Sequence, residues 1–185
     1  MRLLLHICCA PCSTHVVETL KTDHDLTGFF YNPNIHPESE YLRRMEEMKR
    51  YAREISLELV CAEYDSYRWF EMVKGMEDMA EGGKRCFLCY EIRLEKTAQY
   101  AEEHGHQLFA TTLSISPHKN AAKINEIGSE VARRHHLDFH AADFKKRRGF
   151  EKSIRMSKEF GMYRQSYCGC VFSQREAEER SRKKK

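Results

Sequence analysis

Seven of the eight cysteines in this 185-residue chain fall into three short clusters, separated by long cysteine-free stretches. The clusters are Cys8, Cys9 and Cys12; Cys86 and Cys89; and Cys168 and Cys170. Cysteines this close in sequence cannot join distant segments, as the disulfides of small secreted domains do, and a chain of this length can bury a core without them. The spacing therefore indicates a metal or redox site that folding assembles.

Two of these clusters have the spacing of metal ligands. Cys86 and Cys89 are separated by two residues at the start of a predicted helix, where the helix dipole and the two basic residues before them favour thiolate. An iron–sulfur cluster needs about four thiolates, and Cys8 and Cys9, which end the first predicted strand, can supply the others. Zinc takes the same ligands at the same spacing. The spacing leaves both metals open, although the surplus of thiols favours redox chemistry.

The third cluster, Cys168-Gly169-Cys170, has a different chemistry. A disulfide across one residue closes a small, strained ring, and glycine relieves part of that strain. Strained disulfides are the readily reduced ones, so this pair could relay two electrons. Two further metal ligands, or two thiols without a role, are the alternatives.

The hydrophobic pattern predicts five short strands that alternate with helices. The strands are expected at residues 2–7, 26–31, 57–61, 107–111 and 137–140, and the helices at 14–20, 37–55, 67–80, 89–103 and 120–134. Such alternation favours right-handed crossovers and a mostly parallel sheet with helices on both faces. We therefore predict a single domain over residues 1–185 with a Rossmann-like (HUP-type) α/β fold, ending in a basic, flexible tail at about 180–185.

In sheets of this kind, ligands bind beyond the carboxyl ends of the strands. The loops expected at that edge are residues 8–12, 31–36, 61–64, 111–119 and 143–148. The cysteine-rich first loop should therefore lie at the rim of the site. Four histidines near this edge are expected to be hydrogen-bonding core residues rather than ligands, namely His6, His15, His36 and His118. Cys61 is expected to be buried packing, and Asp143 to be a cap or turn residue.

The composition excludes a membrane protein, and the small net charge does not by itself indicate a nucleic-acid partner. Hydrophobic residues make up 41% and charged residues 32% of the chain, and no apolar run approaches the roughly 18 residues of a membrane span. The first residues do not form a signal peptide, so we expect a cytoplasmic location, where free thiols survive. The net charge is only +3, but the positive residues bunch into runs at 43–44, 145–148 and 180–185. Such runs can bind phosphates or can be solvated surface.

Five segments together carry a resemblance that no single one would establish. They are residues 5–13 (LHICCAPCS), 30–37 (FYNPNIHP), 85–94 (RCFLCYEIRL), 111–119 (TTLSISPHK) and 163–170 (YRQSYCGC). In combination they resemble the QueH family, the cobalamin-independent epoxyqueuosine reductases, over nearly the whole chain. The resemblance implies an oxidoreductase that reduces the epoxide of epoxyqueuosine, at the wobble position of tRNA anticodons, to queuosine in the last step of queuosine biosynthesis.

The resemblance also implies a set of functional residues. The implied ligands of a [4Fe-4S] cluster are Cys8, Cys9, Cys86 and Cys89. The implied redox-active, disulfide-forming pair is Cys168 with Cys170. A second, mononuclear iron is associated with the family, and Cys12, left over from the first loop, is its expected ligand here. A metal beside an electron source suits this reaction, because the epoxide oxygen is a poor leaving group without a Lewis acid.

The implied partners are the anticodon loop of an epoxyqueuosine-containing tRNA and an electron donor that the sequence does not identify, with no role for DNA or a membrane. Lys145, Lys146, Arg147 and Arg148 follow the fifth predicted strand, at the cysteine edge, and are the expected phosphate contacts.

Two other functions are compatible with parts of this pattern. An ATP-using tRNA sulfur transferase can share the sheet and carry a cluster, but its glycine-rich phosphate loop is replaced here by Cys8-Cys9-Ala10-Pro11-Cys12-Ser13. A zinc-stabilised RNA-binding module without enzymatic activity would use the thiols structurally, and iron content distinguishes it from the reductase.

Overall fold

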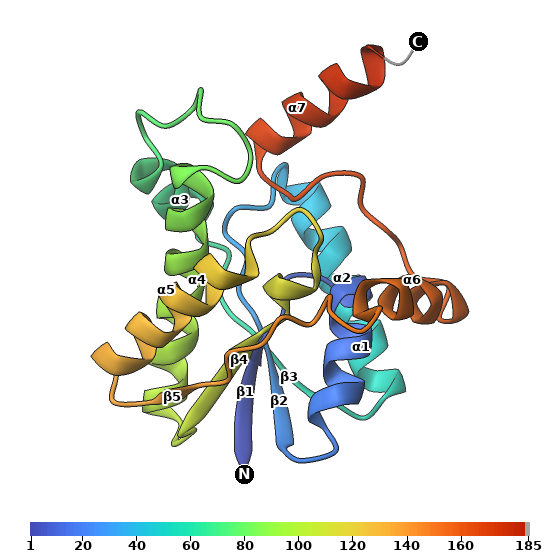
Figure 1. Ribbon diagram of the computed structural model, residues 1–185. Coiled ribbons are helices and arrows are strands. Elements are labelled where there is room, and N and C mark those ends of the chain that lie inside the picture. Colours follow the sequence, from blue (N-terminus) through green and yellow to red (C-terminus); the bar gives the residue numbers. More distant parts are fainter. Residues whose placement is uncertain (184–185) are drawn as a thin grey trace.

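A computed structural model describes residues 1–183 as a five-stranded, entirely parallel sheet with helices on both faces (Figure 1). The strands are β1 (Arg2–His6), β2 (Asp25–Phe30), β3 (Glu58–Cys61), β4 (Leu108–Thr111) and β5 (Asp138–Phe139), in the spatial order β3-β2-β1-β4-β5. The helices are α1 (Ala10–Leu20), α2 (Glu38–Glu54), α3 (Ser66–Met72), α4 (Lys84–Glu103), the 3₁₀ turn η1 (Thr112–Ile115), α5 (Ala121–Arg134), α6 (Gly149–Glu159) and α7 (Val171–Arg182). The predicted Rossmann-like α/β class is confirmed.

The central strand β1 is apolar along both of its faces because both are covered. Leu3 and Leu5 pack into one buried cluster with residues of α1 and α2, whereas Leu4 packs into the other with residues of α4 and α5. This alternation follows the two-residue period of a strand, and continuous apolar character is typical of a parallel strand buried on both sides. Figure 1 shows α1, α2 and α6 on one side of the sheet and α3, α4 and α5 on the other.

Helix α1 begins earlier than the sequence predicts, and the difference matters for the site. Ser13 and Thr14, expected to cap the helix, lie inside it, and their hydroxyls donate to the carbonyl oxygens of Ala10 and Pro11. The cap position is occupied by Cys9 in extended conformation, and Pro11 favours the first helical turn because its φ angle is already close to the helical value. The strand-to-helix turn is therefore only three residues long and consists largely of cysteine.

Two other boundaries were predicted wrongly. Helix α3 ends at Met72, and the chain from there to Gly83 forms turns instead of continuing the predicted helix to residue 80. Helix α4 begins at Lys84, so Cys86 and Cys89 both lie within its first two turns, instead of only Cys89.

The C-terminal part, which the sequence left as helix or loop, returns to the carboxyl edge of the sheet. Helix α6 packs on α1. It begins at Gly149, where a Cβ would collide with the carbonyl oxygen of Phe144 in the preceding loop and would lie 3.0 Å from the His15 ring of α1. Helix α7 then extends beyond that edge (Figure 1). Arg180 and Arg182 occupy its last turn, and residues 184–185 of the predicted flexible tail lie outside the described residues. No helix formed by residues 1–183 is long and apolar enough to cross a membrane.

Candidate metal and redox centre

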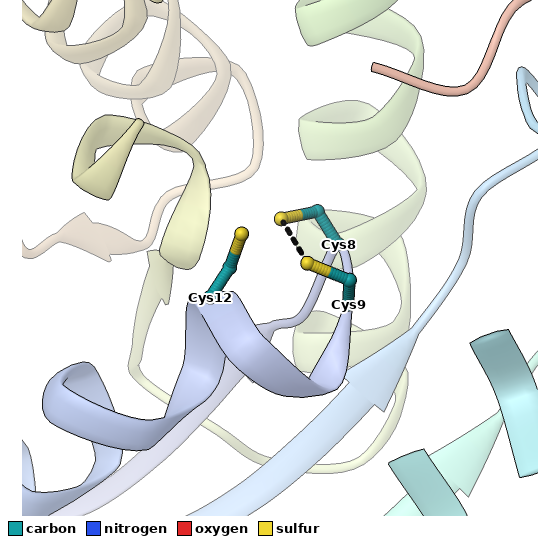
Figure 2. Close-up of side chains that lie close together, drawn as sticks. All are labelled: Cys8, Cys9 and Cys12. Atoms are coloured by element: carbon teal, nitrogen blue, oxygen red, sulfur yellow. Dashed lines mark hydrogen bonds between the residues drawn. The ribbon is translucent and has the colours of Figure 1, made fainter. Parts of the chain in front are cut away.

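Three thiols converge at the N-terminus of α1. The sulfur atoms of Cys8, Cys9 and Cys12 all lie within 4.8 Å of one another, and those of Cys8 and Cys9 are 3.9 Å apart. Figure 2 shows the three side chains pointing toward a common point above the first turn of the helix. Hydrogen bonds from Cys12 and Cys9 lower the pKa of Cys8, whereas burial raises the pKa of Cys9 to about 12. Cys8 is therefore the thiol of the triad that ionises most readily.

Polar donors outside α1 are directed at two of these sulfur atoms. The Thr112 hydroxyl accepts a hydrogen bond from the Cys8 amide at 3.1 Å and donates to the Cys8 sulfur at 3.3 Å. The Gln165 side-chain amide donates to the Cys9 sulfur at 3.0 Å. Hydrogen bonds of this kind stabilise sulfur ligands and tune iron–sulfur sites. The donor set therefore fits a bound metal rather than three buried apolar thiols.

A buried histidine fixes the strand from which the triad starts. The Nδ1 atom of His6 lies 2.9 Å from the Thr111 hydroxyl on β4, and its Nε2 atom lies 3.2 Å from the Tyr31 carbonyl oxygen. Burial, with a smaller contribution from Arg93, lowers the pKa of His6 to about 3, so the ring is neutral. His6 is a hydrogen-bonded core residue, as predicted, and it joins the carboxyl ends of β1 and β4 to the chain that follows β2.

A second set of four thiols lines an adjoining, smaller cavity of about 20 Å³. These are Cys86 and Cys89 from α4, with Cys168 and Cys170 from the loop before α7. The Gly82 amide donates to the Cys86 sulfur at 3.2 Å. The expected thiolate-favouring effect at the start of this helix is not found, because burial outweighs it and raises the pKa of Cys86 to about 11. The guanidinium of Arg85 binds the carbonyl oxygens of Met76 and Glu77, and its Nη2 atom lies 3.6 Å from the Glu176 carboxylate.

The two sets of thiols belong to neighbouring cavities. The triad lines an open cavity of about 570 Å³, and Cys168, Arg93 and Glu81 line this cavity as well as the smaller one. Cys8 and Cys86 also pack against the same small group of buried residues around Tyr90. The structure thus gathers all seven clustered cysteines at one edge of the sheet. Ligation of one cluster by Cys8, Cys9, Cys86 and Cys89 stays a prediction.

The Cys168-Gly169-Cys170 loop is held in place by a buried arginine. Arg44, only 2% exposed, donates to the carbonyl oxygens of Cys168 at 2.9 Å and Tyr167 at 3.3 Å. Gly169 has a φ of 146°, a conformation that favours glycine, and its carbonyl accepts from the amide of His36 at 2.8 Å. The sequence grouped Arg44 with surface residues that contact phosphates or solvent. That interpretation is wrong, because its guanidinium is buried and binds this loop and the Glu40 carboxylate, whose Oε1 atom lies 2.7 Å from Nε.

All eight cysteines, which lie within the described part of the chain, are free thiols. The predicted Cys168–Cys170 disulfide is therefore not present in this state. Cys170 instead caps α7, because its sulfur accepts a hydrogen bond from the Ser173 amide at 3.3 Å.

The basic run after β5 divides into one anchored residue and three exposed ones. The Lys145 ammonium donates to the Lys119 carbonyl oxygen at 3.3 Å and lies 3.1 Å from the Asp143 carboxylate. Lys146, Arg147 and Arg148 are exposed. The run therefore lies next to the cavity that contains the thiol triad, although none of its four residues lines that cavity.

Several residues of the centre were not singled out from the sequence. Thr112 and Gln165 contact cysteine sulfur atoms from other parts of the chain, Arg93 contacts the Cys89 backbone within α4, and Lys119 lines the open cavity. One signal was available for Arg93, which follows Cys89 by four residues and therefore lies on the same face of α4. The contacts of Thr112 and Gln165 depend on chain segments that are about 100 and 156 residues from their partners, and no local pattern reveals them.

A parallel α/β sheet with a thiol-rich centre at its ligand-binding edge defines a protein of the Rossmann-like class with a metal- or redox-active site. The family model described as epoxyqueuosine reductase QueH matches residues 3–176. Together with the relatives described below, this match shows that the chain belongs to the QueH family of oxidoreductases.

Relatives with this description come from distant bacteria. The epoxyqueuosine reductase QueH of Acinetobacter baylyi is 45% identical over 178 residues, covering 95% of this chain and 81% of the relative. That of Staphylococcus epidermidis is 42% identical, covering 93% and 76%. That of Thermotoga maritima is 41% identical, covering 96% and 93%.

Two solved structures share the fold at low sequence identity. A predicted subunit of tRNA methyltransferase from Methanocaldococcus jannaschii gives a TM-score of 0.58 at 12% identity, covering 86% of this chain and 75% of that one. The U34-tRNA thiolase NcsA from Methanococcus maripaludis, solved with its [4Fe-4S] cluster, gives 0.53 at 13% identity, covering 99% and 66%. At this identity the likeness shows the fold alone.

The contacts of Thr112 with Cys8 predict a specific loss of stability. In Thr112→Val the shape is kept, but the Cys8 amide loses its partner, which costs about 1–3 kcal/mol for a buried polar group. Thr112→Ser retains the hydroxyl and should stay close to wild type. Urea unfolding of the metal-free protein measures both variants, and wild-type stability in Thr112→Val would show that this hydrogen-bonded pair does not hold the triad.

Proposed function

We propose that this protein reduces the epoxide of epoxyqueuosine in tRNA to the alkene of queuosine, releasing the oxygen as water. The observation that carries the proposal is the match to the reductase family over residues 3–176, combined with seven cysteines gathered at the ligand-binding edge of the sheet. The reaction consumes two electrons and two protons. A dithiol that becomes a disulfide supplies both, so the conversion balances when Cys168 and Cys170 are oxidised as the epoxide is reduced.

Cys8, Cys9, Cys86 and Cys89 are proposed to hold a [4Fe-4S] cluster, with Cys12 proposed as a ligand of a second, mononuclear iron. The sulfur atoms of the triad within 4.8 Å, and the donors of Thr112 and Gln165 directed at two of them, support iron ligation by this edge of the sheet. When bound, the metal centre supplies single-electron transfer and a Lewis acid for the oxygen that leaves.

The chain itself supplies the binding space and the route between the two sets of thiols. The open cavity of about 570 Å³ can admit the modified base, and the triad, Lys119 and Tyr167 line it. Cys168 lines both cavities, so it can react with groups in either one. Arg44 fixes the carbonyl groups of Tyr167 and Cys168, so the loop can keep its place while the two sulfur atoms join and separate. A separate reductant, of a class able to reduce a disulfide, must restore the dithiol after each turnover.

The substrate is proposed to dock as an anticodon loop. Phosphates of single-stranded RNA are held by basic side chains while unstacked bases enter pockets. Lys146, Arg147 and Arg148 are exposed beside the open cavity and are proposed for this contact. Lys145 is proposed to anchor the run, because its ammonium binds the Lys119 carbonyl oxygen. A tRNA substrate and free thiols also support the proposal of a cytoplasmic location.

The proposed ligand set predicts that Cys86→Ser or Cys89→Ser removes most of the iron and sulfide from anaerobically purified protein, because the cluster loses one of its four thiolates. Cys61→Ser, which changes a cysteine on β3 outside the two cavities, is the matched control and should retain both. Metal and sulfide analysis with the visible absorbance measures the effect. Full retention in both α4 variants would remove this pair from the ligand set.

The proposed electron relay predicts that Cys168→Ala and Cys170→Ala abolish multiple turnover while keeping iron content close to that of the wild type. The assay follows conversion of epoxyqueuosine-containing tRNA to queuosine-containing tRNA by mass spectrometry of the nucleosides, with excess reductant. Wild-type turnover in both variants would exclude the pair as a relay. Absence of product from loaded wild-type protein would contradict the proposed function itself.

The proposed docking mode predicts weaker and less salt-dependent tRNA binding when Lys146, Arg147 and Arg148 are changed to Gln. Each lost phosphate contact should reduce the slope of log affinity against log salt by roughly 0.7 to 0.9. Lys145 is left unchanged because its ammonium binds the Lys119 carbonyl.

The matched control is a variant with the same loss of charge at the opposite edge of the sheet. Lys21→Gln, Arg53→Gln and Arg133→Gln together change exposed residues at the C-terminal ends of α1, α2 and α5. This control should bind tRNA like the wild type. Equal affinity and equal slopes in the two triple variants would show that the run after β5 is ordinary surface charge.

A further inference from the structure

Arg93 is a buried cation whose charge is not neutralised by a carboxylate. Its side chain is 2% exposed, its Nε atom donates to the Cys89 carbonyl oxygen at 3.2 Å, and its Nη1 atom donates to the Asn32 side-chain oxygen at 3.4 Å. Both of these partners are neutral. The third nitrogen, Nη2, is buried and has no hydrogen-bond partner among the described residues. A buried charged donor without a partner is costly, and its positive charge favours an anionic acceptor in the site.

The position of Arg93 shows where that group must lie. Its side chain lines both the cavity of the Cys8–Cys9–Cys12 triad and the cavity of the four other thiols. Asn32, which holds the guanidinium, is fixed in turn because its amide donates to the Ile7 carbonyl oxygen at 2.9 Å. The guanidinium is therefore anchored between the end of β1 and helix α4, at the junction of the two sets of cysteines.

Lys119 places a second cation on the triad side of this junction. It lines the open cavity beside the triad, and its ammonium forms no ion pair with a carboxylate of the described residues. The ammonium of lysine carries a positive charge at neutral pH. Glu81, the acidic residue that lines both cavities, has its carboxylate 3.7 Å from Arg180.

We propose that Arg93 and Lys119 form a cation pair that holds one shared anionic centre between the two sets of cysteines and raises its reduction potential. A thiolate-ligated cluster carries net negative charge, which grows when it gains an electron. Two cations beside the centre, one of them the buried Arg93, favour that reduced state by attraction to the added negative charge. The inference rests on the proposed function, because it assigns positioning residues to the same centre.

The test is the midpoint potential of the anaerobically loaded full-length protein, followed by EPR spectroscopy during a redox titration. Arg93→Met should lower the potential by at least 59 mV, which corresponds to a tenfold change in a one-electron reduction equilibrium. Lys119→Met should lower it in the same direction. Arg93→Lys and Lys119→Arg keep the charge and should recover part of the shift, which a purely structural role would not explain.

The matched control is Arg134→Met, because Arg134 is a half-exposed arginine on α5 paired with Glu91 and Glu95 on the outer surface of α4. It should leave the potential unchanged. Wild-type potentials in Arg93→Met and Lys119→Met proteins that retain their iron and sulfide would overturn the cation pair while leaving the proposed function intact. If Arg93→Met fails to fold, an unshifted Lys119→Met protein overturns the pair. Wild-type protein that takes up no iron or sulfide would instead contradict the proposed function, and the pair with it.

Discussion

The hydrogen bonds of His6 at the carboxyl end of β1 are the constraint on which the site depends. They tie β1 to Thr111 on β4 and to Tyr31 after β2, so the central strand ends at a fixed place between its two neighbours. Within three residues the chain must then turn into α1, and cysteine occupies most of that turn. The same end of β4 leads directly into η1, which brings Thr112 to Cys8. The sheet thus positions a thiol and its donor from segments about 100 residues apart.

The need to balance negative charge on the buried thiols explains why basic side chains surround them. Burial opposes ionisation of the cysteines and raises the pKa of Cys86 and Cys9, so an anionic centre here needs compensation from the protein. In the proposed cation pair, Arg93 lines both cavities and Lys119 lines the larger one, and together they provide this compensation. Arg44 instead holds the loop of Cys168 through carbonyl oxygens. Removal of one buried partner in such a network costs more than its formation stabilises. The cysteines and the basic residues around them therefore act as one set of interacting charges.

The sequence predicts the fold because the fold depends on local patterns. Short apolar runs identify all five strands and helical apolar spacing identifies the helices between them. The tight spacing of Cys86 with Cys89 marks a candidate ligand pair, which stays a prediction. The start of α1 was missed because Ser13 and Thr14 are good caps in isolation, whereas here they bond back to the preceding turn. The buried role of Arg44 could not be predicted, since its contacts with Tyr167 and Cys168 arise only on folding. For Arg93 the spacing from Cys89 predicts a shared helix face, but not the contact with Asn32.

The central claim is that one metal centre draws its ligands from both sets of cysteines. Anomalous diffraction at the iron absorption edge, from crystals of anaerobically loaded protein, tests it most directly. The account predicts a cluster ligated by Cys8, Cys9, Cys86 and Cys89, with the Arg93 guanidinium beside it. Iron bound only by the cysteines of the smaller cavity, with Cys8 and Cys9 left unligated, would contradict the account.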